Sequence, residues 1–239
     1  MKKNIFIVAM LMAGFSNLAL AESCFVTPKP VVPFSFGAAW PYGYHKRNLS
    51  CGCDIEKTYT QDDGTRVIGS GEVFVGGEWL LTPSFLAQFG LAAAALSNTK
   101  ISGDILEIPD DYEFRSASYS YKLSHTRITA KISLSYETTY RNLSLYVDDS
   151  FGLGFNKASS YRLSDQECWA VNSPTFSSKT TQSFVNTVGI GIQMPFKNFR
   201  AAVGYEFDYL GKFALKSSSG ENLSHKLYAN MLKFTLSSA

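Results

Sequence analysis

The chain has 239 residues, of which 45% are hydrophobic, 14% aromatic and 18% charged, and its formal net charge is +2 at pH 7. So small a net charge argues against a nucleic-acid partner, because proteins of that class carry a clustered basic face. After the first residues the longest simple apolar stretch is residues 91–96, far short of the roughly 20 that a membrane-spanning helix needs.

The start of the chain has the pattern of a secretory signal peptide. A short positive region precedes an apolar run at residues 5–15, and a small-x-small site ends at Ala21. The apolar run is too short for a membrane anchor. We therefore expect residues 1–21 to be removed before Glu22, which leaves residues 22–239 as one mature domain.

The mature chain alternates apolar and polar residues with a period of two, which predicts β-strands. Eight strands are expected near residues 32–44, in hairpins over 72–93, 119–155 and 187–213, and near 228–236. The hairpins turn tightly near residues 82–84, 138–142 and 195–198. The remaining connections are longer and are predicted near residues 45–69, 97–118, 158–183 and 214–225.

This alternation of short and long connections predicts an eight-stranded antiparallel up-and-down transmembrane β-barrel. All short turns then lie at one end and all long loops at the other. Bacterial outer-membrane barrels have this arrangement, with the short turns in the periplasm and the long loops outside the cell. The alternative with the same strand count is a soluble barrel of the lipocalin type, which would bury its apolar side.

The two sides of the strands differ in composition. One side is apolar, with aromatic rings near both strand ends, as at Trp40, Tyr136 and Phe213. The other holds glycines and ions, and ions turned to lipid would cost about 2–4 kcal/mol each. We therefore predict a network of ions inside the barrel: Glu72, Glu78, Arg127, Lys131, Asp148, Arg200, Glu206, Asp208, Lys212 and Lys233. Glu206 or Asp208 is expected to meet Lys131 or Arg127 across the lumen.

Some residues do not fit this alternation. Asp149, Asn186 and Asn230 fall on the lipid side, and the apolar residues of the strand that starts at Tyr119 change phase before Ile128. A β-bulge, which inserts one extra residue into a strand, would restore the phase. We expect bulges near residues 124–127 and 148–150.

Four segments carry a resemblance to known proteins: the leader, GEVFVGGEWLLTPSFLAQFGLAA, VGIGIQMPFKNFRAAVGYEFDYL and a final LYANMLKFTLSSA. Through these segments the chain resembles small eight-stranded outer-membrane barrels of Gram-negative bacteria. These are the group of the OmpA transmembrane domain and the opacity proteins. The resemblance covers nearly all of the mature chain. It implies a compact barrel in the outer membrane whose loops, rather than its lumen, meet the outside world.

The four cysteines lie in a chain that the leader sends to an oxidising compartment, where disulfides form. A disulfide between Cys168 and either Cys51 or Cys53 would join two of the long loops. Cys24 precedes the first strand, at the other end of the barrel. Since no histidine stands at a standard ligand spacing from these cysteines, we expect neither a metal nor a cofactor.

Two Ser–His neighbours, Ser124 with His125 and Ser224 with His225, allow an alternative function. Some eight-stranded barrels hydrolyse or transfer acyl chains of lipid A with a serine and a histidine at the barrel wall. No nucleophile motif supports this hypothesis, so we expect the protein not to be an enzyme.

The function expected from these patterns is a structural or adhesin-like role at the cell surface, carried by the long loops. The expected partners are outer-membrane lipids and lipopolysaccharide, with a host or surface ligand at the loops, and the protein is expected to be a monomer. A narrow porin-like channel is the second hypothesis. It is disfavoured because side chains fill the lumen of an eight-stranded barrel.

Overall fold

The computed structural model describes residues 27–43, 46–50, 56–61, 66–108, 115–138, 143–164, 176–217 and 222–238. The expected signal peptide and all four cysteines lie outside these ranges. The described residues contain no helix that is long and apolar enough to cross a membrane.

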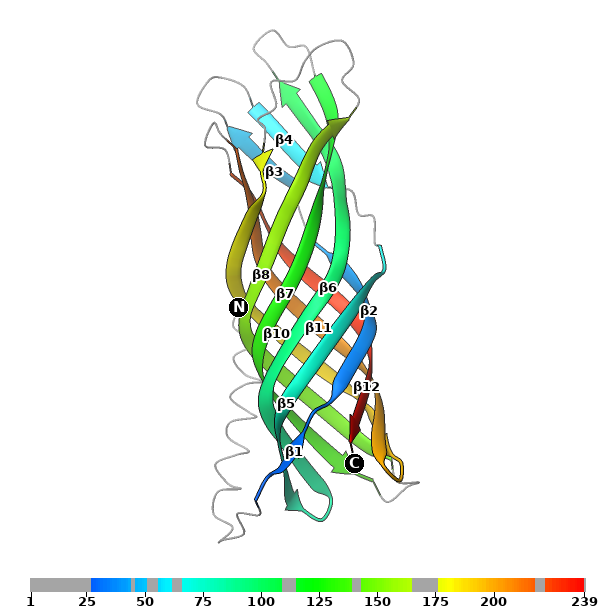
Figure 1. Cartoon of the computed structure of the whole chain (residues 1–239). Coiled ribbons are helices and arrows are strands. Elements are labelled where there is room, and N and C mark those ends of the chain that lie inside the picture. Colours follow the sequence, from blue (N-terminus) through cyan, green and yellow to red (C-terminus); the bar gives the residue numbers. More distant parts are fainter. Residues whose placement is uncertain are drawn as a thin grey trace.

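Eight strands close into a ring (Figure 1). In chain order they are β2 (Phe34–Tyr42), β5 (Ile68–Thr82), β6 (Phe85–Ile108), β7 (Arg115–Glu137), β8 (Ser144–Ser164), β10 (Lys179–Pro195), β11 (Phe199–Ser217) and β12 (Asn222–Ser238). Each strand pairs antiparallel with its neighbours in the chain, and β12 pairs with β2 to close the ring. The predicted eight-stranded up-and-down barrel is therefore confirmed.

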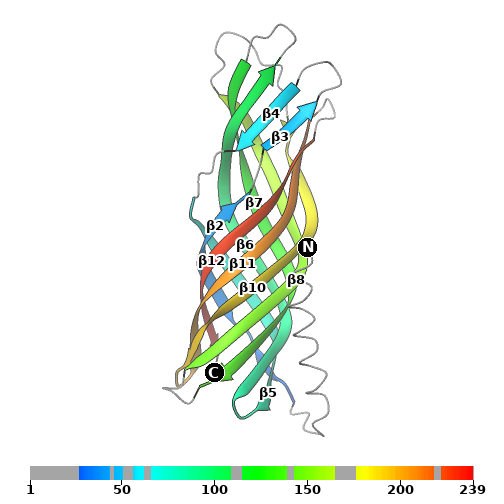
Figure 2. The same ribbon diagram turned by 180° about the vertical axis from the view of Figure 1, so that it is seen from behind.

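Four shorter strands extend this wall. Strand β1 (Lys29–Val31) pairs with β5, and β9 (Phe176–Ser177) pairs with β11. Strands β3 (Lys46–Ser50) and β4 (Glu56–Gln61) form a hairpin that pairs with β6 through β4. Figures 1 and 2 show this hairpin at the opposite end of the barrel from the C-terminus.

The two ends of the barrel differ in their connections. The C-terminal end of β12, the tight turns after β5 and β10, and the facing ends of β7 and β8 lie at one end, called here the turn end (Figure 1). At the other end, the loop end, the strands run further than the sequence predicts. Strand β6 has 24 residues and β7 has 23, so most of the predicted loop at residues 97–118 is strand. Likewise β8 continues to Ser164 and β11 to Ser217.

An apolar belt surrounds the half of the barrel nearer the turn end. Its side chains point outward and are exposed, and they include Phe34, Phe36, Val73, Val75, Phe89, Leu91, Ile128, Val147, Phe151, Leu153, Val188, Ile190, Ile192, Val203, Phe207 and Leu232. An apolar surface of this extent is not stable in water. The belt therefore faces lipid, and the soluble barrel with a buried apolar side is excluded.

The strand register differs from the predicted one at two places. On β7 the odd-numbered residues from Ala117 to Lys131 all point inward, so no bulge lies at residues 124–127. The register shifts of β7 occur nearer the loop end, between Ser120 and Lys122 against β8 and opposite residues 96–99 of β6. Strand β8 also pairs without interruption through Asp149, so the second predicted bulge is absent too.

Candidate functional site

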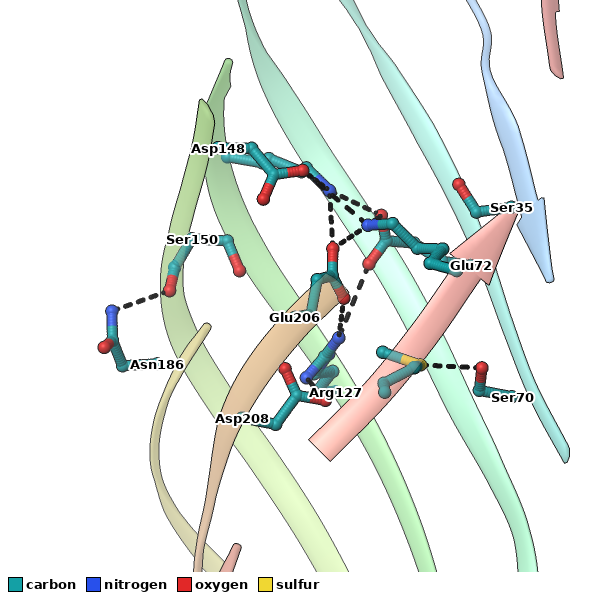
Figure 3. A network of polar contacts seen from close by, with 12 residues as sticks. Ser35, Ser70, Glu72, Arg127, Asp148, Ser150, Asn186, Glu206 and Asp208 are labelled. Carbon is teal, nitrogen blue, oxygen red and sulfur yellow. Dashed lines mark hydrogen bonds and ion pairs between the residues drawn. The ribbon is translucent and has the colours of Figure 1, made fainter. Parts of the chain in front are cut away.

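The ion network lies inside the barrel, in the half that carries the apolar belt. Figure 3 shows the network from close by. Lys131 Nζ lies 2.8 Å from Glu72 Oε1 and 3.0 Å from Asp148 Oδ2. Lys233 Nζ contacts Glu206 and lies 3.3 Å from Glu72 Oε1. These groups come from β5, β7, β8, β11 and β12, so ion pairs join strands that are not neighbours in the wall.

Arg127 lies at the side of the network that is nearer the loop end. Its Nη1 lies 3.0 Å from Asp208 Oδ2, and its Nη2 lies 3.5 Å from Glu72 Oε2 and 3.8 Å from Glu206 Oε2. The predicted contact of Glu206 or Asp208 with Lys131 or Arg127 is therefore present. All of these side chains are buried, and a buried charge is tolerated only where opposite charges surround it.

A second ion pair lies closer to the turn end. Arg200 donates to both carboxylate oxygens of Glu78, at 2.8 Å for Nη2 to Oε1, and Gln88 Nε2 donates to Glu78 Oε2 at 2.8 Å. A small cavity lies between this pair and the network and is lined in part by Ser35, Gln88 and Lys131. The predicted Glu78 and Arg200 are thus inside the barrel but separate from the main network.

Lys212 is not in the network, which corrects the prediction. The register of β11 against β12 shifts between Tyr209 and Gly211, where Gly211 has a φ of 84°. This bulge reverses the phase of the rest of the strand, so Lys212 points outward and is exposed. For the same reason Phe213, which was predicted to face lipid, is inside and only 1% exposed.

An apolar core that the sequence analysis missed fills the lumen toward the loop end. It contains Ile101, Ile105, Tyr119, Tyr121, Leu123, Ala158, Phe176, Leu210, Phe213, Leu215, Leu227 and Ala229. The ring of Tyr121 lies 6.2 Å from that of Tyr119 and 5.7 Å from that of Phe213. The change of apolar phase between Tyr119 and Ile128 is the sequence signal of this core. It reflects a change in the polarity of the interior and not the predicted bulge, because β7 keeps the same residues inward throughout.

Asn156 joins the core to the region of the ions. Its Nδ2 donates to the backbone oxygens of Leu210, at 2.8 Å, and Lys212, at 3.0 Å, and its Oδ1 lies 2.7 Å from His125 Nδ1. These bonds satisfy the two carbonyls on either side of Gly211, where the bulge interrupts the ladder. The buried amide of Asn156 therefore stabilises the bulge, together with the hydroxyl of Ser183, which donates to the Lys212 oxygen at 3.4 Å.

The Ser–His neighbours face opposite sides of the wall. His125 and His225 are buried inside the barrel, whereas Ser124 and Ser224 lie on the other side of their strands, because successive residues of a strand alternate. Neither neighbouring pair can meet as a nucleophile and its base.

The polar residues on the lipid side have partners. Asn186 Nδ2 donates to Asp149 Oδ1 at 2.9 Å. It also donates to the backbone oxygen of Ser150 at 3.0 Å, the contact drawn in Figure 3. Tyr205 donates its hydroxyl to Asn230 Oδ1 at 2.7 Å. Cross-strand hydrogen bonds thus reduce the cost of polar groups in the belt, without the bulge that we predicted at Asp149.

Within the residues that the structure describes, no group of three histidine, cysteine, aspartate or glutamate side chains is placed to hold a metal ion. Cys51, Cys53 and Cys168 lie outside these residues, so the loop disulfide remains a prediction.

No family model matches the chain, and no curated protein matches it either. Solved structures similar to it include Neisserial surface protein A, with 12% identity, 87% of this chain and 96% of that chain covered, and a TM-score of 0.46. The attachment invasion locus protein Ail of Yersinia pestis has 14% identity, coverages of 87% and 99%, and a TM-score of 0.35. The outer membrane protein AlkL has 15% identity, coverages of 91% and 93%, and a TM-score of 0.38.

The eight-stranded barrel of this chain is established by its own strand pairing, and its lipid-facing belt by its own exposed side chains.

Proposed function

We propose that this protein is a surface-exposed outer-membrane barrel with a structural or adhesin-like role, carried by its loop end. The observation that supports this role is the length of the wall. A transmembrane strand needs about 9–11 residues, whereas β6, β7 and β8 have 24, 23 and 21. The wall therefore continues well beyond the apolar belt.

The outer surface of this continuation is polar. On β7 the outward side changes from Ile128 in the belt to Ser124, Lys122 and Ser116 toward the loop end. Inside it lies the apolar core, which is packed as in a water-soluble domain. Such a part of the barrel is built to stand in water, and it carries the loop ends of these strands beyond the apolar belt.

The filled lumen disfavours the narrow channel. Ion pairs span the lumen in the half within the membrane, and aromatic side chains close it toward the loop end. Conduction would require both layers to open. Recordings of the refolded protein in planar bilayers are expected to show no large, steady conductance, and such a conductance would favour the channel instead.

The proposal includes no catalytic step. Ser124 and His125 point to opposite sides of the wall, and so do Ser224 and His225. Lipid A from cells with and without the protein is expected to have the same acyl-chain composition.

The orientation can be tested with two epitope tags in otherwise identical chains. One tag replaces Lys197 in the tight turn between β10 and β11, and the other is inserted between Ser217 and Asn222. On intact bacteria an antibody is expected to bind the second tag only, and to reach the first only after the outer membrane is permeabilised. The reverse pattern would overturn the orientation.

The surface role is tested separately by shortening the connections within residues 45–69 or 158–183. Binding of whole cells to a host surface is expected to fall while the amount of barrel in the outer membrane is unchanged. Unchanged binding by both shortened proteins would contradict the adhesin-like role.

A further inference from the structure

A pair of lysines stands outside the barrel where the apolar belt ends. Lys212 of β11 and Lys226 of β12 are direct cross-strand partners, and both are exposed. Directly opposed side chains of a sheet lie about 4.5–5.5 Å apart at their Cβ atoms, and like charges at this spacing repel each other. Within the part of the chain that the structure describes, no carboxylate forms an ion pair with either lysine.

A cluster of tyrosines lies directly below this lysine pair. Tyr228 is the next outward residue on β12, and its ring stacks on Tyr42 at 5.8 Å and contacts Tyr209 at 5.3 Å. Tyrosines collect at the boundary between hydrocarbon and headgroups, because their rings are apolar and their hydroxyls are polar. The lysine pair therefore lies at the level of the lipid headgroups on the loop-end side.

The bulge at Gly211 is what brings the two lysines together. Without the phase reversal, residue 212 would point into the lumen and Phe213 would point outward. The backbone of Lys212 is fixed on both sides of the residue. Its amide donates to Ser183 Oγ at 3.2 Å, and its carbonyl accepts from Asn156 Nδ2 at 3.0 Å.

We propose that Lys212 and Lys226 bind a phosphate group of a phosphorylated lipid in the outer leaflet, with the lipid's acyl chains against the belt. A phosphate placed between the lysines converts their repulsion into two charge-assisted contacts. The tyrosine cluster and the belt below it are matched to the rest of such a lipid, which favours a lipid phosphate over free phosphate. This inference rests on the proposed position of the barrel in the outer membrane.

A second cross-strand lysine pair provides a matched control. Lys100 of β6 and Lys122 of β7 are also direct partners and exposed, but their neighbouring outward side chains are Ser102, Ser120 and Ser124 rather than tyrosines. Replacing both lysines of either pair by glutamine removes the same charge from the same kind of position.

The test uses the full mature chain refolded into zwitterionic phosphocholine bicelles. The probe is a diphosphorylated acyl disaccharide, compared with the dephosphorylated molecule that has the same acyl chains, and binding is measured by native mass spectrometry. The wild-type protein is expected to prefer the phosphorylated probe. Lys212→Gln with Lys226→Gln should weaken its binding about tenfold, while the same change at Lys100 and Lys122 should weaken it less than twofold.

Each remaining outcome has a defined meaning. Lys212→Arg with Lys226→Arg retains both charges and should retain binding. Equal losses from the two glutamine variants would mean diffuse attraction, and they would overturn the site, as would tight binding of inorganic phosphate alone. A protein that inserts into bicelles but does not distinguish the probes would overturn only this inference, whereas failure to insert would overturn the membrane barrel itself.

Discussion

The two halves of this barrel have opposite polarity. In the half nearer the turn end, ions lie inside and apolar side chains cover the outside, whereas toward the loop end the inside is apolar and the outside polar. Strand β7 shows this change along its inward side. From the turn end toward the loop end, that side carries Lys131 and Arg127 and then Leu123 and Tyr121. Which side of a strand is apolar thus depends on the surroundings of the wall, lipid in one half and water in the other.

The largest expected effect comes from breaking the ion network. Arg127→Leu removes the cation nearest Asp208 and leaves buried carboxylates with fewer opposite charges. We expect the free energy of unfolding to fall by about 3–5 kcal/mol, because an unpaired buried charge is costly. Urea unfolding of the protein refolded into phosphocholine bilayers measures this change.

The control for this prediction replaces both partners. Arg127→Leu with Asp208→Leu removes one charge of each sign, so it should recover most of the lost stability. If the double variant is no more stable than Arg127→Leu, the network does not act through charge pairing.

The next prediction uses one substitution at two heights of the outer wall. Ile190→Lys puts a charge in the belt, on a side chain that is 61% exposed, and should lower the free energy of unfolding by about 2–4 kcal/mol. Ser116→Lys puts the same charge on the polar surface toward the loop end and should change stability by less than about 0.5 kcal/mol. Equal effects in the same unfolding experiment would mean that the two surfaces do not face different solvents.

A smaller effect separates the apolar core from the apolar belt. Leu215→Ala leaves a cavity at a fully buried position and should lower the free energy of unfolding by about 2 kcal/mol. This value is near the lower end for substitutions of a buried leucine by alanine, because the site lies close to the loop end. Leu232→Ala in the belt should cost much less, since lipid chains can fill the space. Hydrogen exchange should show faster exchange of the loop-end amides in Leu215→Ala alone. Uniform acceleration over the whole barrel would contradict independent behaviour of the two halves.

The sequence predicts the parts of this molecule that repeat from strand to strand. Alternation, the spacing of turns and the different composition of the two sides are sufficient for eight strands, the lipid-facing belt and the inward direction of residues such as Glu72 and Lys131. The sequence does not predict the apolar core, because alternation does not show where the wall leaves the lipid and its inward side becomes apolar. Lys212 was misplaced for a different reason, since one bulge at a single glycine reverses every position after it.

The smallest predicted effect concerns that glycine. Gly211 has a φ of 84°, which other residues rarely adopt, and a Cβ there would meet Ser183 and come within 3.0 Å of the backbone oxygen of Phe184. Gly211→Ala should therefore cost about 1–2 kcal/mol in the urea experiment. Gly71→Ala is the matched control, because a Cβ at Gly71 meets nothing within 4 Å, and it should be neutral or slightly stabilising.

Two further variants separate the causes of this cost. Adding Ser183→Ala to Gly211→Ala removes the hydroxyl that the new methyl group meets, but it also removes the hydrogen bonds of that hydroxyl to the amide and carbonyl of Lys212, so it should recover only part of the cost. Asn156→Leu, by contrast, should destabilise the bulge with Gly211 intact, because the carbonyl of Leu210 loses its side-chain donor and that of Lys212 keeps only the longer bond from Ser183 Oγ, at 3.4 Å. If Gly211→Ala is as stable as Gly71→Ala, the bulge does not depend on glycine. The outward position of Lys212, on which the lipid-phosphate site depends, would then need another cause.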